Sequence, residues 1–183
     1  MPRLIVLNGP PGIGKSTLAR RYADDHPPAL CAELDAVRQL VGGWRADLAA
    51  SGERARRLTL AMAGEHLAAG HDVVVPQYLG NPQFLAEAEA VAARTGASFD
   101  EFVLTDNRDE VVRRFNARTA AATEPAHVDA GRTIARLGGD ATLFTMCDRL
   151  LLVTAARPDA RVLQCPEGAA DAVYRELLDH LAE

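Results

Sequence analysis

The sequence predicts an α/β fold in which one parallel sheet of five strands carries helices on both faces. Two observations predict it. Short apolar runs alternate along the chain with longer amphipathic segments, which is the pattern of strands joined by crossover helices. A glycine-rich turn follows the first apolar run and opens a helical segment, which is the context of a phosphate-binding loop. The 183 residues are enough for a single domain, 1–183, and no linker or repeat divides them.

The expected strands are short, and turn-forming residues separate them from their neighbours. The first run leads into the glycine-rich turn, and the second follows the break at Pro27-Pro28. The third is a compact β-branched run that Pro76 should stop. The fourth alternates apolar and polar residues, and the fifth is a short run near the C-terminus. We place these strands at 4–7, 29–34, 72–75, 98–104 and 161–164.

The expected helices begin and end at local signals. The first starts near Lys15, inside the glycine-rich motif. Gly70 ends the second helix, Asn81 is placed to cap the third, and Gly96 follows its end. The pair Gly138-Gly139 separates two later helices. Helical patterns cover 18–23, 53–69, 82–94, 108–119, 129–137, 140–155 and 168–182.

The composition is that of an ordinary globular protein, with 48% hydrophobic and 25% charged residues. A net charge of −5 argues against a general nucleic-acid binder. The longest apolar stretches are too short to cross a bilayer, and the chain runs directly into its first strand without a signal peptide. The three cysteines are widely spaced and form no C-x-x-C pair. We therefore expect a cytoplasmic protein with reduced thiols and neither nucleic-acid nor membrane partners.

Residues 9–17 match the phosphate-binding pattern G-x-x-x-x-G-K-[ST] without a gap. Gly12 and Gly14 let main-chain N–H groups wrap around a phosphate without side-chain clash. Pro10-Pro11 has no N–H groups to offer, so the donors come from Gly12 onward. The positive end of the following helix points at the same anion. We expect nucleotide binding by Gly9, Gly12, Ile13, Gly14, Lys15, Ser16 and Thr17.

The polar side chains of this loop suit ATP and Mg²⁺. Lys15 should reach the β- and γ-phosphates, Ser16 should give its hydroxyl to Mg²⁺, and Thr17 is placed for the α-phosphate. A catalytic role follows for Lys15, because its charge would act on the phosphoryl group during transfer. The sequence has no guanine-reading N-K-x-D motif, so ATP is the expected donor.

Two carboxylates, Glu33 and Asp35, lie two residues apart at the end of the predicted second strand. The strand period of two would put both on one face, pointing toward the phosphate loop. We assign Asp35 as the general base that accepts the proton of a substrate hydroxyl, and Glu33 as a ligand of Mg²⁺ or substrate. Arg38, one turn later, is a candidate substrate ligand. Two structural alternatives stay open: Asp35 capping the following helix, and Arg38 on a solvated face.

Polar residues also follow the third strand, where many proteins with this loop place an aspartate that organises Mg²⁺. Here Val73-Val74-Val75 is followed by Pro76 and then Gln77, which can hydrogen-bond but carries no charge. The carboxylate for the metal therefore comes from the second strand, or Mg²⁺ is held mainly by Ser16, the phosphates and water. Gln77 and Asn81 are candidate substrate ligands, because both follow the carboxyl end of a strand.

A basic group on the helix at 108–119 leads into an alanine-rich polar segment. Arg114 and Arg118 are four residues apart and share a helix face. Guanidinium groups match the spread negative charge of a migrating phosphoryl group, so we assign both arginines a catalytic role. The segment at about 119–132 would then be a lid that closes over ATP and excludes water. The alternative is a solvated, salt-bridged helix face.

These residues resemble the class of phosphate-loop kinases that includes nucleoside monophosphate kinases, shikimate and gluconate kinases, zeta toxins and chloramphenicol phosphotransferase. The resemblance is carried by Gly9 to Thr17, by Glu33-Leu34-Asp35 and by Arg114 to Arg118 before the lid. A closer likeness is to tunicamycin-resistance ATP-binding proteins, which share a third strand ending in valine-proline, here within Val73 to Tyr78. The resemblance implies the strand order 2-3-1-4-5, ATP as the donor, and an antibiotic or related metabolite as the acceptor.

The leading hypothesis is an ATP-dependent phosphotransferase that moves the γ-phosphate to a hydroxyl of a small molecule, such as an antibiotic, nucleoside or sugar-like metabolite. The alternative is an ATP-binding switch or a ligand-sequestering resistance protein that transfers nothing, which the neutral Gln77 favours. A toxin-like kinase that modifies a nucleotide sugar is a third reading. The expected partner is a small-molecule substrate, and the expected assembly is a monomer or homodimer.

Overall fold

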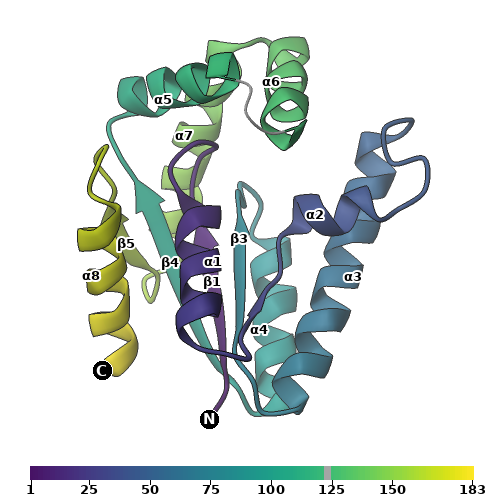
Figure 1. Ribbon diagram of the computed structural model, residues 1–183, viewed down its shortest axis with the longest axis vertical. Helices are drawn as coiled ribbons and strands as arrows, with labels where there is room; N and C mark the ends of the chain where they lie inside the picture. Colours follow the sequence, from purple (N-terminus) through teal and green to yellow (C-terminus); the bar gives the residue numbers. More distant parts are fainter. Residues whose placement is uncertain (122–124) are drawn as a thin grey trace.

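A computed structural model, which describes residues 1–121 and 125–183, confirms the α/β architecture (Figure 1). Its centre is a five-stranded parallel sheet with the strand order β2-β3-β1-β4-β5, which is the order that the resemblance implied. The strands are β1 (Arg3–Asn8), β2 (Leu30–Cys31), β3 (Val73–Gln77), β4 (Ser98–Thr105) and β5 (Arg161–Gln164).

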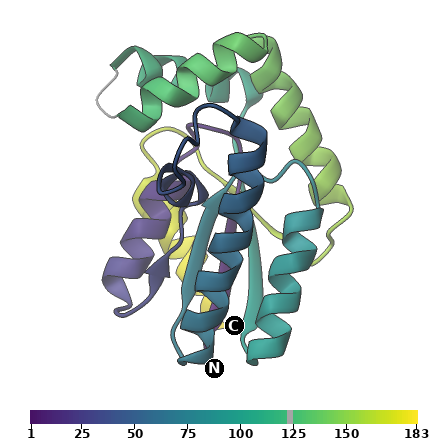
Figure 2. The same ribbon diagram turned by 90° about the vertical axis from the view of Figure 1, so that its right-hand side faces the viewer.

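Helices lie on both faces of the sheet and across the carboxyl ends of its strands (Figures 1 and 2). α1 and α8 cover one face, whereas α3, α4 and α7 contribute to the core on the other. α5 and α6 lie above the carboxyl ends, over the first loop of the chain. The helices are α1 (Lys15–Asp25), α2 (Leu34–Gln39), α3 (Leu48–Ala68), α4 (Gln83–Thr95), α5 (Arg108–Ala121), α6 (Pro125–Leu137), α7 (Asp140–Ala155) and α8 (Ala170–Ala182).

Alternating side chains of the sheet build two separate hydrophobic cores. In β1, Ile5 and Leu7 pack toward α1 and α8, while Leu4 and Val6 pack toward α3 and α4. All four side chains are fully buried, as a central strand covered on both faces requires. A third, smaller cluster joins α5, α6 and α7 and contains Val112, Phe115, Ile134 and Leu143. The lid region therefore has a core of its own above the sheet.

The third strand does not stop at Pro76, as the sequence had predicted, but continues to Gln77. Pro76 pairs in register with Leu7 of β1. On its other side β2 has already ended, because β2 pairs only with Val73 and Val74. A proline is tolerated where one side of the strand has no partner for its missing N–H group. Gln77 is thereby held beside Asn8 at the carboxyl edge of the sheet.

The predicted second strand, 29–34, is also corrected. Only Leu30–Cys31 pairs with the sheet, and the chain turns into α2 at Leu34. Glu33 occupies the N-cap position of α2, and Asp35 lies in its first turn. The strand periodicity that placed these two carboxylates on one face therefore does not apply to them. The N-cap residue of α2 is Glu33 and not Asp35, for which capping was the alternative. The Glu33 side chain makes no capping hydrogen bond.

One largely buried ion pair joins β4 to the segment that follows α7. Glu101 of β4 is almost fully buried and accepts a hydrogen bond from Nε of Arg157, which follows α7. Arg157 also donates to Glu89 of α4 over 2.5 Å. Burial raises the pKa of Glu101, and the Arg157 guanidinium opposes that rise. The carboxylate depends on this partner to stay charged in an apolar environment.

We therefore predict that Arg157→Ala lowers the free energy of unfolding by about 3 kcal/mol, because it leaves the buried Glu101 carboxylate without its cation. Urea denaturation monitored by circular dichroism measures the loss. Arg175→Ala, which removes an exposed arginine from α8, is the matched control and should change stability by less than about 0.5 kcal/mol. The double variant E101L/R157L should recover most of the lost stability. Equal losses of stability in Arg157→Ala and Arg175→Ala would contradict the assignment.

Candidate active site

The phosphate loop, residues 9–17, packs tightly against the backbones of β4 and α5. A Cβ at Gly9 would lie 2.7 Å from the carbonyl oxygen of Leu104, and a Cβ at Gly12 would lie 3.3 Å from the backbone of Phe115. Gly12 and Gly14 have positive φ angles of 87° and 108°, which other residues rarely adopt. The space beside the Gly14 Cα is open. The loop is thus fixed from below and accessible where its N–H groups would meet an anion.

Lys15 begins α1, as predicted, and its side chain folds back over the loop. Its Nζ donates a hydrogen bond to the Pro10 carbonyl oxygen at 2.8 Å. Burial, and after it the positive charge of Arg118, lower the pKa of Lys15 to about 7, while Asp35 opposes the shift. Three of the four residues predicted to be catalytic therefore lie close enough for their charges to interact.

The two carboxylates after β2 differ in their surroundings. Glu33 accepts a hydrogen bond from Nε of Arg20 at 2.7 Å and so is paired with the side of α1. Asp35 is more exposed, and its Oδ1 lies 2.9 Å from Nη2 of Arg38. Only Asp35 acts on the charge of Lys15. Of the two, Asp35 is therefore the carboxylate whose charge acts on the lysine of the phosphate loop.

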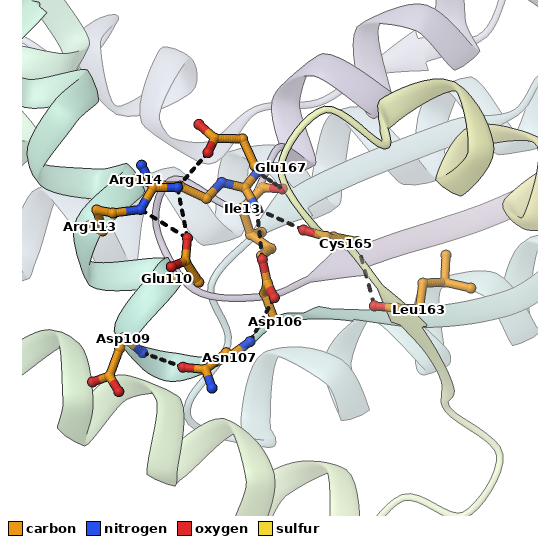
Figure 3. Close-up of polar contacts among 10 residues, drawn as sticks. All are labelled: Ile13, Asp106, Asn107, Asp109, Glu110, Arg113, Arg114, Leu163, Cys165 and Glu167. Atoms are coloured by element: carbon orange, nitrogen blue, oxygen red, sulfur yellow. Dashed lines mark hydrogen bonds and ion pairs between the residues drawn. The ribbon is translucent and has the colours of Figure 1, made fainter.

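Arg114 ties three parts of the chain together beside the loop (Figure 3). Its Nη1 donates to the carbonyl oxygen of Cys165 at 2.7 Å and to Oδ2 of Asp106 at 3.2 Å. Its Nη2 donates to the carbonyl oxygen of Ile13 at 3.3 Å. Arg118, one turn later, lies over the Phe115 ring instead, 5.4 Å from its centroid. The two arginines share α5, but Arg114 donates a hydrogen bond to the loop, while the charge of Arg118 acts on Lys15.

A cavity of about 250 Å³ lies between the phosphate loop and the segment that follows β5. Arg114 contributes its one charged side chain, and the remaining lining is mainly apolar. Pockets that enclose a whole drug-sized ligand are typically about 300–1,000 Å³. This cavity therefore suits one end of a larger ligand whose other end lies on the open loop. It is lined by Gly12, Thr17, Arg114, Cys165, Pro166 and Gly168, among others.

Asn8 is a site-shaping residue that the sequence analysis missed. It is fully buried at the end of β1, and its carboxamide exchanges hydrogen bonds with both the N–H and the carbonyl group of Leu79. These bonds hold the loop after β3, including Asn81, next to the phosphate loop. Asn81 itself is exposed and accepts a hydrogen bond from the Gln83 N–H at 2.9 Å, but the N-cap residue of α4 is Pro82 and not Asn81 as expected. A lone polar residue between an apolar strand and a glycine-rich turn was the available signal.

The predicted lid, 119–132, lies partly outside the described residues, which omit 122–124. Residues 119–121 finish α5, and α6 begins at Pro125 rather than at 129 as expected. Gly131 of α6 packs against α5, and a Cβ there would lie 2.3 Å from Cγ2 of Thr119. Arg45, in the loop between α2 and α3, reaches Asp129 of α6 at 2.8 Å. The segment thus sits above the loop and contacts the opposite side of the site.

For a metal ion, the chain offers dispersed oxygen donors. Ser16 is half-buried at the start of α1, and Glu33 and Asp35 lie at the start of α2. Within the described residues, no three His, Cys, Asp or Glu side chains gather in one place. A hydroxyl, one carboxylate, phosphate oxygens and water are the donors that Mg²⁺ prefers, so the residues present fit that ion.

Among the described residues, every helix is too short or too polar to cross a bilayer.

A parallel sheet in this order, with a glycine-rich loop and a helix N-terminus at its carboxyl edge, defines the fold of the phosphate-loop kinases. The chain belongs to the AAA domain family AAA_33, whose model matches residues 4–137. None of the curated proteins matches the sequence significantly.

Solved structures with the same fold cover almost the whole chain at low sequence identity. Shikimate kinase from Bacteroides thetaiotaomicron matches with a TM-score of 0.63 and 19% identity over 99% of both chains. A gluconokinase from Sinorhizobium meliloti 1021 matches with a TM-score of 0.62 and 19% identity, over 99% of this chain and 96% of its own. The tunicamycin resistance protein of Deinococcus radiodurans matches with a TM-score of 0.61 and 14% identity over the same shares.

We predict that ATP binding at pH 8 takes up close to one proton. At that pH a lysine with a pKa of about 7 is mostly neutral, whereas bound phosphates favour its charged form and raise the pKa again. The uptake should become smaller at pH 6, where Lys15 is already protonated. Calorimetric titration in buffers of different ionisation enthalpy measures it. Lys15→Arg, which stays charged, should bind ATP without this proton uptake. A proton uptake in Lys15→Arg equal to that of the wild type would contradict the prediction.

We also predict that Arg114→Ala weakens ATP binding roughly tenfold or more, because Arg114 lines the cavity and holds the Ile13 carbonyl of the phosphate loop, and one hydrogen bond to a charged group stabilises by about 1.5–3 kcal/mol. Arg113→Ala is the matched control. Arg113 is exposed and pairs with Glu110 and Glu167 on the surface (Figure 3), so its loss should change the ATP Kd less than about twofold. Similar losses in both variants would show that Arg114 has no special role in the pocket.

Proposed function

We propose that the protein transfers the γ-phosphoryl group of ATP to a hydroxyl of a small molecule. The observation that carries this proposal is the phosphate loop, whose Lys15 begins α1 and lies close enough to Asp35 and Arg118 for their charges to act on its pKa. One cation for the phosphates, one carboxylate for the acceptor and one further cation above them are the groups that phosphoryl transfer needs. Membership of the AAA_33 family and the shared kinase fold support it.

The proposed reaction assigns one step to each side chain. Lys15 leaves the Pro10 carbonyl and binds the β- and γ-phosphates, while the loop N–H groups hold their oxygens. Asp35 accepts the proton of the acceptor hydroxyl. As the hydroxyl oxygen bonds to the γ-phosphorus, the bond between that phosphorus and the bridging oxygen breaks and ADP leaves. Arg118 stabilises the charge on the migrating group. Ser16 and a carboxylate, Asp35 or Glu33, would hold Mg²⁺, which supplies charge neutralisation when bound.

The two ends of the site suit two different ligands. The nucleoside of ATP would occupy the cavity beside Arg114 and Cys165, because that cavity adjoins the loop on the side of α1 and α8. The acceptor would lie on the other side, between Asp35 and Arg38 of α2, Gln77 at the end of β3, and α6. The structures of similar fold include a gluconokinase, a shikimate kinase and a tunicamycin resistance protein. We infer a hydroxylated acceptor, with an antibiotic, nucleoside or sugar-like metabolite as candidates.

A second candidate is an ATP-binding switch or ligand-sequestering protein that transfers nothing. The uncharged Gln77 at the end of β3 favours it, since no carboxylate stands there to organise Mg²⁺. A cytoplasmic location and a monomeric or homodimeric state belong to either proposal. Detection of a phosphorylated product separates the two candidates.

The test offers Mg²⁺-ATP and pooled antibiotics, nucleosides, sugars and amino sugars to the purified protein and searches for a phosphate adduct by mass spectrometry. We predict an adduct that Lys15→Ala fails to form, because the phosphates lose their cation. Thermal unfolding of the variant verifies that it is folded. Tight ATP binding with no adduct from any pool would favour the binding protein instead.

A further prediction concerns the base. Asp35→Asn should lower kcat by about 10²-fold or more and leave the Kd for ATP within about threefold, because the amide cannot accept the proton but keeps the shape of the side chain. Glu33→Gln, assayed in parallel, separates the two carboxylates, since Glu33 is already paired with Arg20. Normal turnover by Asp35→Asn would remove the proposed base.

A further inference from the structure

An unbroken series of contacts runs from Asp35 to the lid helix α6, and this series is not part of the phosphate-loop motif. Asp35 pairs with Arg38 at 2.9 Å. The guanidinium of Arg38 lies 5.3 Å from the centroid of the Trp44 ring, and that of Arg45 lies 4.1 Å from it. Arg45 then pairs with Asp129 of α6 at 2.8 Å. We call these five residues the Trp44 relay.

The middle of the relay is anchored independently of its ends. The carbonyl oxygen of Trp44 accepts a hydrogen bond from the hydroxyl of Ser51 at 3.0 Å, and Ser51 is almost fully buried in α3. The Trp44 N–H donates to the carbonyl of Val41 at 3.2 Å. The Trp44 backbone is therefore attached to α3, and the guanidinium groups of Arg38 and Arg45 both lie within cation–π distance of its ring.

The ends of the relay are weaker than its middle. Arg45 is 66% exposed, so its ion pair with Asp129 is of the surface type that opens easily. Asp129 has Arg132 as a second guanidinium neighbour at 4.0 Å. The contact between α6 and the Trp44 loop can thus form and break without unfolding either element, which is what a closing lid requires.

We propose that Trp44 and Arg45 are positioning residues, which orient Arg38 and through it the Asp35 carboxylate, and which make that orientation depend on contact with α6. The inference rests on the proposed function, because Asp35 is its base. In the closed arrangement Asp129 holds Arg45 against the Trp44 ring, Arg38 lies near the same ring, and one oxygen of Asp35 is fixed by Arg38. The other oxygen of Asp35 is left to accept the proton of the acceptor hydroxyl.

Turnover and ATP binding are the first measurements. Phosphate release from Mg²⁺-ATP with water as the acceptor is assayed first, and transfer to the acceptor found in the mass-spectrometric screen follows. Trp44→Ala should lower kcat roughly tenfold, as expected for the loss of two cation–π contacts, and leave the ATP Kd unchanged. Trp44→Phe, which keeps an aromatic face, should restore most of kcat. If Trp44→Ala instead caused a structural defect, ATP binding would weaken as well, and the aromatic ring of Trp44→Phe would not restore kcat.

Trp44 is the single tryptophan of the chain, so its fluorescence reports on the relay without any turnover. Arg45→Ala and Asp129→Asn should both increase quenching of Trp44 by acrylamide and lower kcat by up to about fivefold. Arg136→Ala, which removes an exposed arginine from the same helix as Asp129, is the matched control and should change neither.

The outcomes separate the two proposals. A wild-type protein that releases no phosphate and modifies no acceptor would contradict the proposed function, and this result is known before any variant is made. Transfer by the wild type with a normal kcat in Trp44→Ala would overturn the relay alone. Quenching that stays the same in Asp129→Asn would likewise overturn the connection between α6 and the Trp44 ring.

Discussion

The close approach of the phosphate loop to two neighbouring backbones is the constraint on which the rest of the site depends. Gly9 leaves no room for a side chain against Leu104 of β4, and Gly12 leaves almost none against Phe115 of α5. The loop therefore takes its position from the sheet on one side and from α5 on the other. Since α5 also carries Arg114 and Arg118, the same packing determines which part of the loop each guanidinium reaches.

The charges around this loop are arranged in two groups with separate roles. On the side of α8, Arg114 donates three hydrogen bonds to protein acceptors and lines a small, mainly apolar cavity. On the side of α2, the charges of Arg118 and Asp35 act on Lys15, whose pKa is lowered to about 7 chiefly by burial. A phosphate bound beside Lys15 would favour its charged form and raise that pKa again.

Most of the fold and the central loop could be predicted from local sequence, and the errors have physical causes. Helix ends such as Gly96 and the glycine-rich motif depend on residues next to each other, so they were found. The length of β2 and the passage of β3 through Pro76 depend on which strands pair, and no local signal records that. The same applies to Glu33, whose partner Arg20 lies 13 positions earlier. The roles assigned to individual site residues stay predictions.

The shortness of the outer strands affects how readily the protein aggregates through the edges of its sheet. β2 contributes two residues and β5 contributes four, so each margin of the sheet presents few unpaired backbone groups. An open sheet margin recruits further chains in proportion to the length and flatness of its exposed ladder. Beyond Cys31 the chain leaves the margin at once and becomes the helix α2. The early end of β2 therefore limits fibril-like growth, and the same turn begins the helix that carries Asp35.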